Sequence, residues 1–351
     1  RRVITNGRGD MRARQRVLRV GVYGTGTWAC RTHIPNLQRL QGVAVAALSD
    51  ADPERLQAAA AQFGVQRTYA DAHEMLDREE LDILFSVVPA FARTDVEAEA
   101  AGRGVHLFSE KPQALTMAVA RRIDEAVRRA GVLSTVCFRE RYRPLFQQAR
   151  RLLAGRKVVH VRFQMAGGLP LRQSDVPAGQ EDQWHYRMDQ AGGPAFDWGV
   201  HAVDYVRFMT GLDVEQAQAF YHHPAEFNRP LSCSFSFQLG GGATMTMTFV
   251  SAAPLPSPAE PPFTVFCEGG HLALWMYDRI AVDGQVVYRA DEFDPWFEQD
   301  RVFVEAVRSG DPSGILNDYH DGLFSLAPVL AGWESARGGG TLIHVPTYMA
   351  A

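Results

Sequence analysis

The chain lacks the features that mark membrane and nucleic-acid-binding proteins. No apolar run in its 351 residues reaches the length that crosses a bilayer. The N-terminal arginines are not followed by the apolar segment of a secretory signal. The formal net charge of −4 gives no basic excess to attract nucleic acid or an anionic membrane. We therefore expect neither nucleic acid nor a membrane as a partner.

Cysteine is scarce, and its spacing argues against both a disulfide framework and a metal centre. The four cysteines lie far apart in the chain and form no C-x-x-C pair. They are Cys30, Cys137, Cys233 and Cys267. We interpret them as buried thiols in a reducing cytosol, and we predict a cytoplasmic protein without a metal site.

The length of the chain predicts two domains, because one core rarely grows so large. Residues 1–16 are expected to be a disordered extension. From Val17 to Phe138, apolar segments of strand length alternate with helical segments, which predicts a parallel, doubly wound α/β sheet over residues 17–138. Residues 139–351 are expected to form an α+β domain with a large, mostly antiparallel sheet. Its strands are predicted at Val158–Met165, Glu215–Tyr221, Ser232–Leu239, Ala243–Val250 and Thr264–Glu268.

A glycine-rich turn follows the first apolar strand. Gly24, Gly26 and Ala29 have the G-x-G-x-x-G/A spacing of a dinucleotide-binding turn. Gly24 permits the tight turn, Gly26 lets the backbone approach a pyrophosphate, and Ala29 lets the helix pack closely on its strand. The backbone N–H groups at the helix start then favour the phosphates.

An acidic residue, Asp50, ends the next apolar run, Val43–Ser49. A carboxylate at this position accepts hydrogen bonds from the ribose hydroxyls and repels a 2′-phosphate. The alternative is an ordinary turn residue before a helix. Asp50 favours NAD over NADP as the cofactor.

Two further stretches carry chemistry. Lys111 lies in Ser109-Glu110-Lys111-Pro112, directly after a predicted strand, where ligands of parallel sheets bind; Pro112 could be preceded by a cis bond. Asp197 and His201 are four residues apart, so on one helix they would be neighbours and could form an acid/base pair. Taken alone, these could be a surface Glu-Lys pair and a buried structural histidine.

The order and spacing of these motifs resemble the glucose-fructose oxidoreductase/inositol dehydrogenase/rhizopine-catabolism (Gfo/Idh/MocA) family of NAD(P)-dependent oxidoreductases. The resemblance rests on the glycine turn, the E-K-P triplet and the G-G-x-x-x-D-x-G-x-H-x-x-D run from Gly192 to Asp204, and it extends to about Pro346. It also includes the F-R-x-R-Y-x-P segment at Phe138–Pro144. The chain departs from the family at Pro89-Ala90-Phe91-Ala92-Arg93, where members often have P-N-x-x-H, and at Pro194, where a glycine is usual.

The resemblance implies a Rossmann domain that binds NAD, or less readily NADP, and catalytic roles for Lys111, Asp197 and His201. The candidate cofactor contacts are Gly24, Thr25, Gly26, Thr27, Trp28, Asp50, Val88, Pro89, Glu110 and Lys111. The candidate substrate contacts are Lys111, Arg141, Trp184, Tyr186, Asp197 and His201. By analogy with the family, and because threonine and methionine alternate in one predicted strand, a homodimer or homotetramer is expected.

The predicted reaction is hydride transfer between the nicotinamide and a secondary alcohol of a sugar, cyclitol or related polyol. Histidine, with a reference pKa near 6.5, suits a general acid/base at neutral pH better than lysine, near 10.4. We therefore expect His201 to carry the proton, Asp197 to orient it or bind a hydroxyl, and Lys111 to stabilise the developing oxyanion. Two other functions fit the same frame: an NAD-dependent glycoside hydrolase, and a non-catalytic regulatory protein that binds NAD and a sugar.

Overall fold

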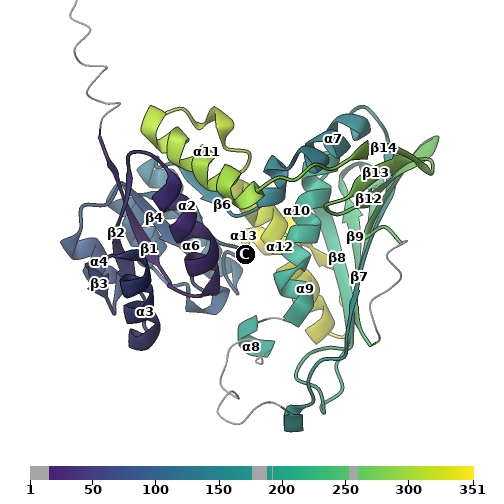
Figure 1. Cartoon of the computed structure of the whole chain (residues 1–351). Coiled ribbons are helices and arrows are strands. Elements are labelled where there is room, and N and C mark those ends of the chain that lie inside the picture. The colour runs from purple at the N-terminus through teal and green to yellow at the C-terminus, as the bar shows by residue number, and fades with distance from the viewer. Residues whose placement is uncertain (1–15, 176–187, 192, 253–259) are drawn as a thin grey trace, which may run out of the picture. The chain divides into compact units, whose positions relative to one another are not determined.

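The computed structural model describes residues 16–175, 188–191, 193–252 and 260–351. Contacts within the chain divide it into two units (Figure 1). The first unit contains the residues up to Glu110, Arg121–Arg139 and Asp294–Tyr319, and the second contains Lys111–Ala120, Glu140–Phe293 and His320–Ala351. The linear domain limits expected from the sequence stay a prediction, and the expected N-terminal extension lies, apart from Arg16, outside the described residues.

The first unit holds a six-stranded parallel sheet, which confirms the doubly wound α/β prediction. The strand order is β3-β2-β1-β4-β5-β6, with all neighbours parallel. The strands are β1 (Leu18–Tyr23), β2 (Val43–Ser49), β3 (Thr68–Tyr69), β4 (Ile83–Ser86), β5 (His106–Ser109) and β6 (Ser134–Val136). The helices are α2 (Ile34–Arg39), α3 (Pro53–Phe63), α4 (Ala72–Arg78), α5 (Val96–Gly102) and α11 (Pro295–Ser309), with α6 (Met117–Ala130) starting in the second unit and continuing into the first.

An aromatic core joins the central strands of this sheet to α11. The rings of Phe85 on β4 and Phe108 on β5 stack with centroids 4.3 Å apart. Phe303 of α11 contacts Phe108 edge-on at 5.8 Å. All three side chains are buried. The packing of these rings brings a helix from residues 295–309 into the unit that the first third of the chain builds.

The second unit is built on a nine-stranded sheet that is mostly antiparallel, as predicted. Its order is β14-β13-β12-β11-β7-β10-β9-β8-β15, and β10 and β7 form its parallel pair. The strands are β7 (Val158–Gly167), β8 (Val214–His222), β9 (Ser232–Leu239), β10 (Thr244–Ser251), β11 (Phe263–Cys267), β12 (Gly270–Trp275), β13 (Arg279–Val282), β14 (Gln285–Arg289) and β15 (Ile343–His344). The helices are α7 (Pro144–Leu153), α8 (Met188–Ala191), α9 (Gly193–Asp197), α10 (Gly199–Thr210), α12 (Tyr319–Arg337) and α13 (Val345–Ala350).

One face of the nine-stranded sheet is buried, and the opposite face is more exposed and carries polar side chains together with Phe220 and Phe266. In β10, Met245 and Met247 are buried, whereas Thr246 and Thr248 are partly exposed on the opposite face. Helix α10 lies against the buried face (Figure 1), and Gly199 at its start packs close to Met247. The exposed face is compatible with the expected homo-oligomer, which stays a prediction. Within the described ranges, no helix combines the length and apolar character needed to cross a bilayer.

The sequence reading missed the strands β12 to β15. The turn between β12 and β13 contains Tyr277 at a φ of +68°, so the glycine that usually marks such a conformation is absent. The last strand, β15, has only two residues, which is too short for an alternating pattern.

Candidate cofactor and catalytic site

The glycine turn after β1 has the geometry that its spacing predicts. Gly24 has a φ of +94°, and a Cβ there would lie 2.9 Å from the backbone carbon and oxygen of Val87. Only glycine fits this position without moving β4's end. At Gly26 a Cβ would meet no atom within 4 Å, so the backbone is open to close approach by a ligand. Ala29 is fully buried at the helix start.

Asp50, directly after β2, holds this turn in place by hydrogen bonds. Its Oδ2 accepts hydrogen bonds from the Thr25 backbone N–H (2.7 Å) and hydroxyl (2.9 Å). Its Oδ1 accepts from the Asp52 N–H at 2.9 Å. The guanidinium of Arg55, on α3, lies 3.4 Å from Oδ2. Asp50, which the sequence predicts to bind the ribose, thus also fixes the turn. The cationic Arg55 lies beside it.

An aromatic and cationic stack lies next to the turn, and the sequence reading recognised only part of it. Trp28 is 54% exposed, and its ring stacks on Trp296 of α11 with centroids 6.0 Å apart. The guanidinium of Arg139 lies 4.1 Å from the Trp296 ring centroid. Only Trp28 was predicted. Trp296 has no sequence signal, because it reaches this position through the packing of α11.

Lys111 and Asp197 form an ion pair within the second unit. Lys111 Nζ donates to Asp197 Oδ1 at 2.6 Å and lies 3.4 Å from the Asp197 carbonyl oxygen. The lysine side chain is 13% exposed and the aspartate side chain 53%. The Lys111–Pro112 peptide bond is cis, as the sequence reading had raised. The structure therefore brings together two of the three predicted catalytic residues.

The condition for Asp197 and His201 to be neighbours on one helix is not met, because they lie on separate helices. Asp197 is the last residue of α9, Trp198 forms a turn, and His201 lies in the first turn of α10. His201 is buried, with its ring 5.5 Å from that of Trp198 and 5.6 Å from that of Tyr205. Asp197, at the end of α9, pairs with Lys111 from another part of the chain.

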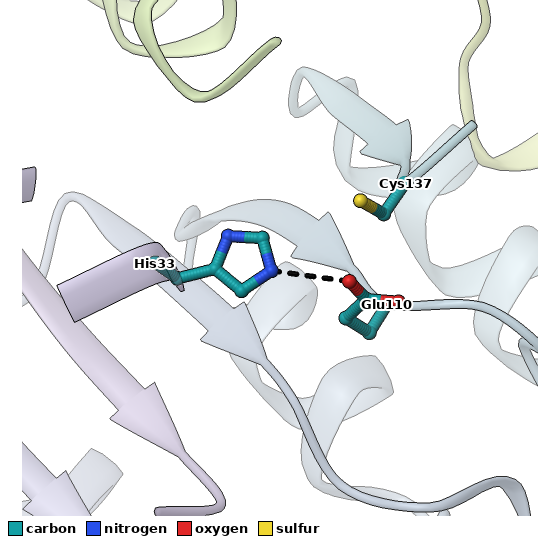
Figure 2. A group of neighbouring side chains, drawn as sticks. All are labelled: His33, Glu110 and Cys137. Atoms are coloured by element: carbon teal, nitrogen blue, oxygen red, sulfur yellow. Dashed lines mark hydrogen bonds and ion pairs between the residues drawn. The ribbon is translucent and has the colours of Figure 1, made fainter. Parts of the chain in front are cut away.

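A buried polar group surrounds Glu110 in the first unit (Figure 2). His33 Nε2 lies 3.1 Å from Glu110 Oε1, and His33 Nδ1 lies 3.0 Å from Asp300 Oδ1. Burial alone would lower the pKa of His33, but the Asp300 charge and the hydrogen bonds from both sides raise it well above its usual range. Burial raises the pKa of the neighbouring Cys137 thiol to about 12.

The buried group was not predicted, because His33 and Asp300 are 267 residues apart. Its members His33, Glu110 and Cys137 offer ligand atoms that lie within 4.8 Å of one another, which is also a donor set for a metal ion. The absence of a metal site, expected from the cysteine spacing, stays a prediction. As expected, Cys137, Cys233 and Cys267 are buried, whereas Cys30 is half-buried, and all four are free thiols.

Family comparison agrees with this geometry. A model described as an oxidoreductase family with an NAD-binding Rossmann fold matches residues 18–138. A second, the Gfo/Idh/MocA C-terminal domain, matches residues 146–273. The chain belongs to the Gfo/Idh/MocA family. The description of the matching model makes this an oxidoreductase family with an NAD-binding Rossmann fold.

Two named dehydrogenases are similar to this chain. D-apiose dehydrogenase of Paraburkholderia graminis is 34% identical over 182 residues, which cover 52% of this chain and 47% of that enzyme. D-xylose 1-dehydrogenase (NADP(+)) 2 of Haloferax volcanii is 25% identical over 332 residues, covering 91% of this chain and 97% of that enzyme. The chain thus spans about half the length of the first and nearly all of the second.

A solved structure of similar fold is the WlbA dehydrogenase from Bordetella pertussis in complex with NADH and UDP-GlcNAcA. Its TM-score is 0.78 at 23% identity, over 94% of this chain and 98% of that one. At this identity the likeness shows the fold alone.

The residues of this Gfo/Idh/MocA chain fit a dinucleotide. Gly24 and Gly26 provide the turn and the open backbone, and the Asp50 carboxylate ends β2, where a ribose is held in this fold. Trp28 is exposed beside them. Pro89 begins the 3-10 turn η2 (Ala90–Ala92), and the Val88 carbonyl accepts a hydrogen bond from Arg93 at 3.2 Å. Cofactor contacts at Thr27, Val88 and Pro89 stay predictions.

The candidate substrate residues have different outcomes. Arg141 is buried and donates to Asp204 Oδ1 at 2.6 Å from Nη2, and it pairs with Asp321 Oδ2 at 2.6 Å. Burial opposes its charge, but these two carboxylates raise the pKa of Arg141. This buried network holds α10 through Asp204. A role for Arg141 in substrate binding stays a prediction. Trp184 and Tyr186 lie outside the described residues.

Proposed function

We propose that the chain is a dehydrogenase or reductase that acts on a secondary alcohol of a sugar, cyclitol or related polyol. The observation that carries this proposal is the ion pair between Lys111 Nζ and Asp197 Oδ1 at 2.6 Å. An ammonium held by a carboxylate, in a chain with a dinucleotide turn, is the arrangement that polarises an alcohol or carbonyl oxygen. Similarity to enzymes named for apiose and xylose supports a sugar substrate.

The bound nicotinamide supplies the hydride acceptor or donor. Lys111 stabilises the negative charge that develops on the substrate oxygen, and Asp197 holds its ammonium in place. His201 takes the hydroxyl proton during oxidation and returns it during reduction. The rings of Trp198 and Tyr205 restrict the His201 imidazole to a narrow range of orientations.

We propose NAD as the preferred cofactor, because the buried Asp50 carboxylate is unfavourable to a 2′-phosphate. The relatives differ on this point: one is named for NADP(+), and the solved structure was obtained with NADH. Arg55, 3.4 Å from Asp50, offsets part of that repulsion.

The test is a screen for reduced cofactor over pentoses, hexoses, inositols and sugar acids, run with NAD and NADP in parallel. Reduction with at least one polyol, faster with NAD, is the expected result. Release of free sugar from an aryl glycoside without net reduction would instead assign the glycosidase function. Tight NAD binding with no turnover on any member of the panel would assign the regulatory one.

A further inference from the structure

We propose that Glu110 is a positioning residue, held at its side chain by His33 and at its backbone by Arg93, and that this clamp fixes the point from which Lys111 leaves the first unit. Glu110 is the last residue of that unit before the chain enters the second at Lys111. The inference rests on the proposed role of Lys111.

The side-chain half of the clamp is the contact with His33. This imidazole is fully buried, and both of its nitrogens face carboxylates: Nε2 faces Glu110 at 3.1 Å, and Nδ1 faces Asp300 at 3.0 Å. An ionised carboxylate accepts and does not donate, so when both carboxyl groups are ionised both ring nitrogens carry protons. Asn36 donates a further hydrogen bond to Asp300 Oδ2 at 2.9 Å. The His33 imidazole thereby links the Glu110 carboxylate to Asp300 on α11.

The backbone half of the clamp is Arg93. Its Nη2 donates to the Glu110 carbonyl oxygen at 2.5 Å. Its Nη1 donates to the hydroxyls of Ser86 (3.0 Å) and Ser109 (2.9 Å), which end β4 and β5. Glu97, 3.1 Å away, balances the charge, and both side chains of this ion pair are fully buried. Arg93 therefore joins two strand ends to the residue before Lys111.

The two halves leave Glu110 little freedom. Its N–H donates to the Ser86 carbonyl at 2.9 Å, so the amide, the carbonyl and the side chain are each bonded. Arg93 lies at the position where the resembling family often has the histidine of P-N-x-x-H. Since a misplacement of about 1 Å can cost roughly 100-fold in rate, a rigid attachment at this point is of use to a catalytic lysine.

A metal ion is the competing occupant of the same residues. His33, Glu110 and Cys137 are of the right types. The clamp instead requires the 3.1 Å contact between His33 Nε2 and Glu110 Oε1 to be a direct hydrogen bond, and this distance is within the normal range. The experiment below separates the two.

The experiment uses the two lysines of the chain, Lys111 and Lys157. The intact protein is labelled with a trace of acetic anhydride over a range of pH, and the Lys111 and Lys157 peptides are quantified together by mass spectrometry. Lys157, exposed and paired with Glu268, serves as the internal reference. This readout needs no substrate, so it stays informative even if the proposed reaction fails.

Glu110→Gln, His33→Gln and Arg93→Lys are each expected to raise the labelling of Lys111 relative to Lys157 by about threefold or more. The reason is that a looser attachment lowers the population of the Lys111–Asp197 pair. Met75→Ala, a buried truncation in α4, controls for lost stability and should leave the ratio unchanged. In a turnover assay, the clamp variants should lose kcat. Because Glu110 is itself a candidate cofactor contact, the dissociation constant for NAD is compared in His33→Gln and Arg93→Lys, where it should change little.

Two outcomes would overturn the clamp. One is an unchanged labelling ratio in folded Glu110→Gln and Arg93→Lys proteins, or an equal change in Met75→Ala. The other is a stoichiometric metal ion in the purified protein that Cys137→Ala removes, which would assign the group to a metal centre. If the clamp variants shift the ratio but no polyol is oxidised, the proposed function fails and the clamp stands.

Discussion

Lys111 and Asp197 are 86 residues apart in the chain, and their side chains meet at 2.6 Å. The pair joins the end of α9 to the segment that follows β5 in sequence. Asp197, at the end of its helix, keeps an exposed side chain, whereas that of Lys111 is mostly buried. The Asp197 side chain is thus accessible to a ligand. The Lys111 ammonium is largely shielded from water, and its charge acts more strongly in that less polar environment.

The first prediction concerns the kind of cation at position 111. Lys111→Arg should lower kcat/KM by roughly 100-fold or more, because a planar guanidinium cannot place one compact charge at the same point. Lys157→Arg is the matched control, and it should leave turnover unchanged. Steady-state kinetics on a substrate from the polyol screen measure both. Near-normal activity in Lys111→Arg would show that any positive charge is enough.

The second prediction concerns His201 as the proton carrier. His201→Gln, which roughly preserves volume between Trp198 and Tyr205, should reduce turnover by about 100- to 10,000-fold, the range for loss of a general acid/base. NAD binding, measured by calorimetry, should persist. His222→Ala, on an exposed strand position, is the control. Retained turnover in His201→Gln would move the proton transfer to another group.

The sequence was sufficient where chemistry follows local spacing. The glycine turn, Asp50 at a strand end and the alternation of Met245 with Thr246 depend on residues within a few positions of one another, so a pattern could reveal them. The six-stranded parallel sheet followed from the alternation of strands and helices.

The sequence was insufficient where packing joins distant segments. Nothing near His33 in the chain indicates that Asp300 will face it, or that Trp296 will stack on Trp28. Both contacts depend on α11 joining a unit built mostly from the first 139 residues. The pairing of Asp197 with Lys111 was missed because these two residues are also far apart in the chain, although each was expected at the site.

The third prediction is a pH dependence of stability that comes from His33. Because Asp300 and Glu110 raise its pKa in the folded protein, its contribution to the free energy of unfolding is complete below the unfolded imidazole pKa of about 6.5 and is lost as the pH rises through the higher folded value. The groups that face it are Asp300, Glu110 and Cys137.

Urea titrations of the wild-type protein and His33→Gln at several pH values test this. The difference between their free energies of unfolding should be largest near pH 6 and should shrink in alkaline solution. A difference that is constant across the range, or that grows with pH, would mean that His33 is neutral in the folded protein.

The fourth prediction concerns cofactor preference at the end of β2. Arg55→Ala should widen the preference for NAD over NADP, by about three- to tenfold in kcat/KM, because it removes the cation that lies 3.4 Å from the Asp50 carboxylate and leaves that charge to repel a 2′-phosphate. Asp50→Asn should narrow the preference and also weaken NAD binding, since an amide cannot replace every bond that the carboxylate accepts from Thr25 and Asp52. Arg78→Ala, an exposed arginine on α4 paired with Glu74, is the control. If Arg55→Ala instead abolished the use of NADP and NAD equally, the arginine would be acting on the diphosphate or on the fold, and Asp50 would have to discriminate without it.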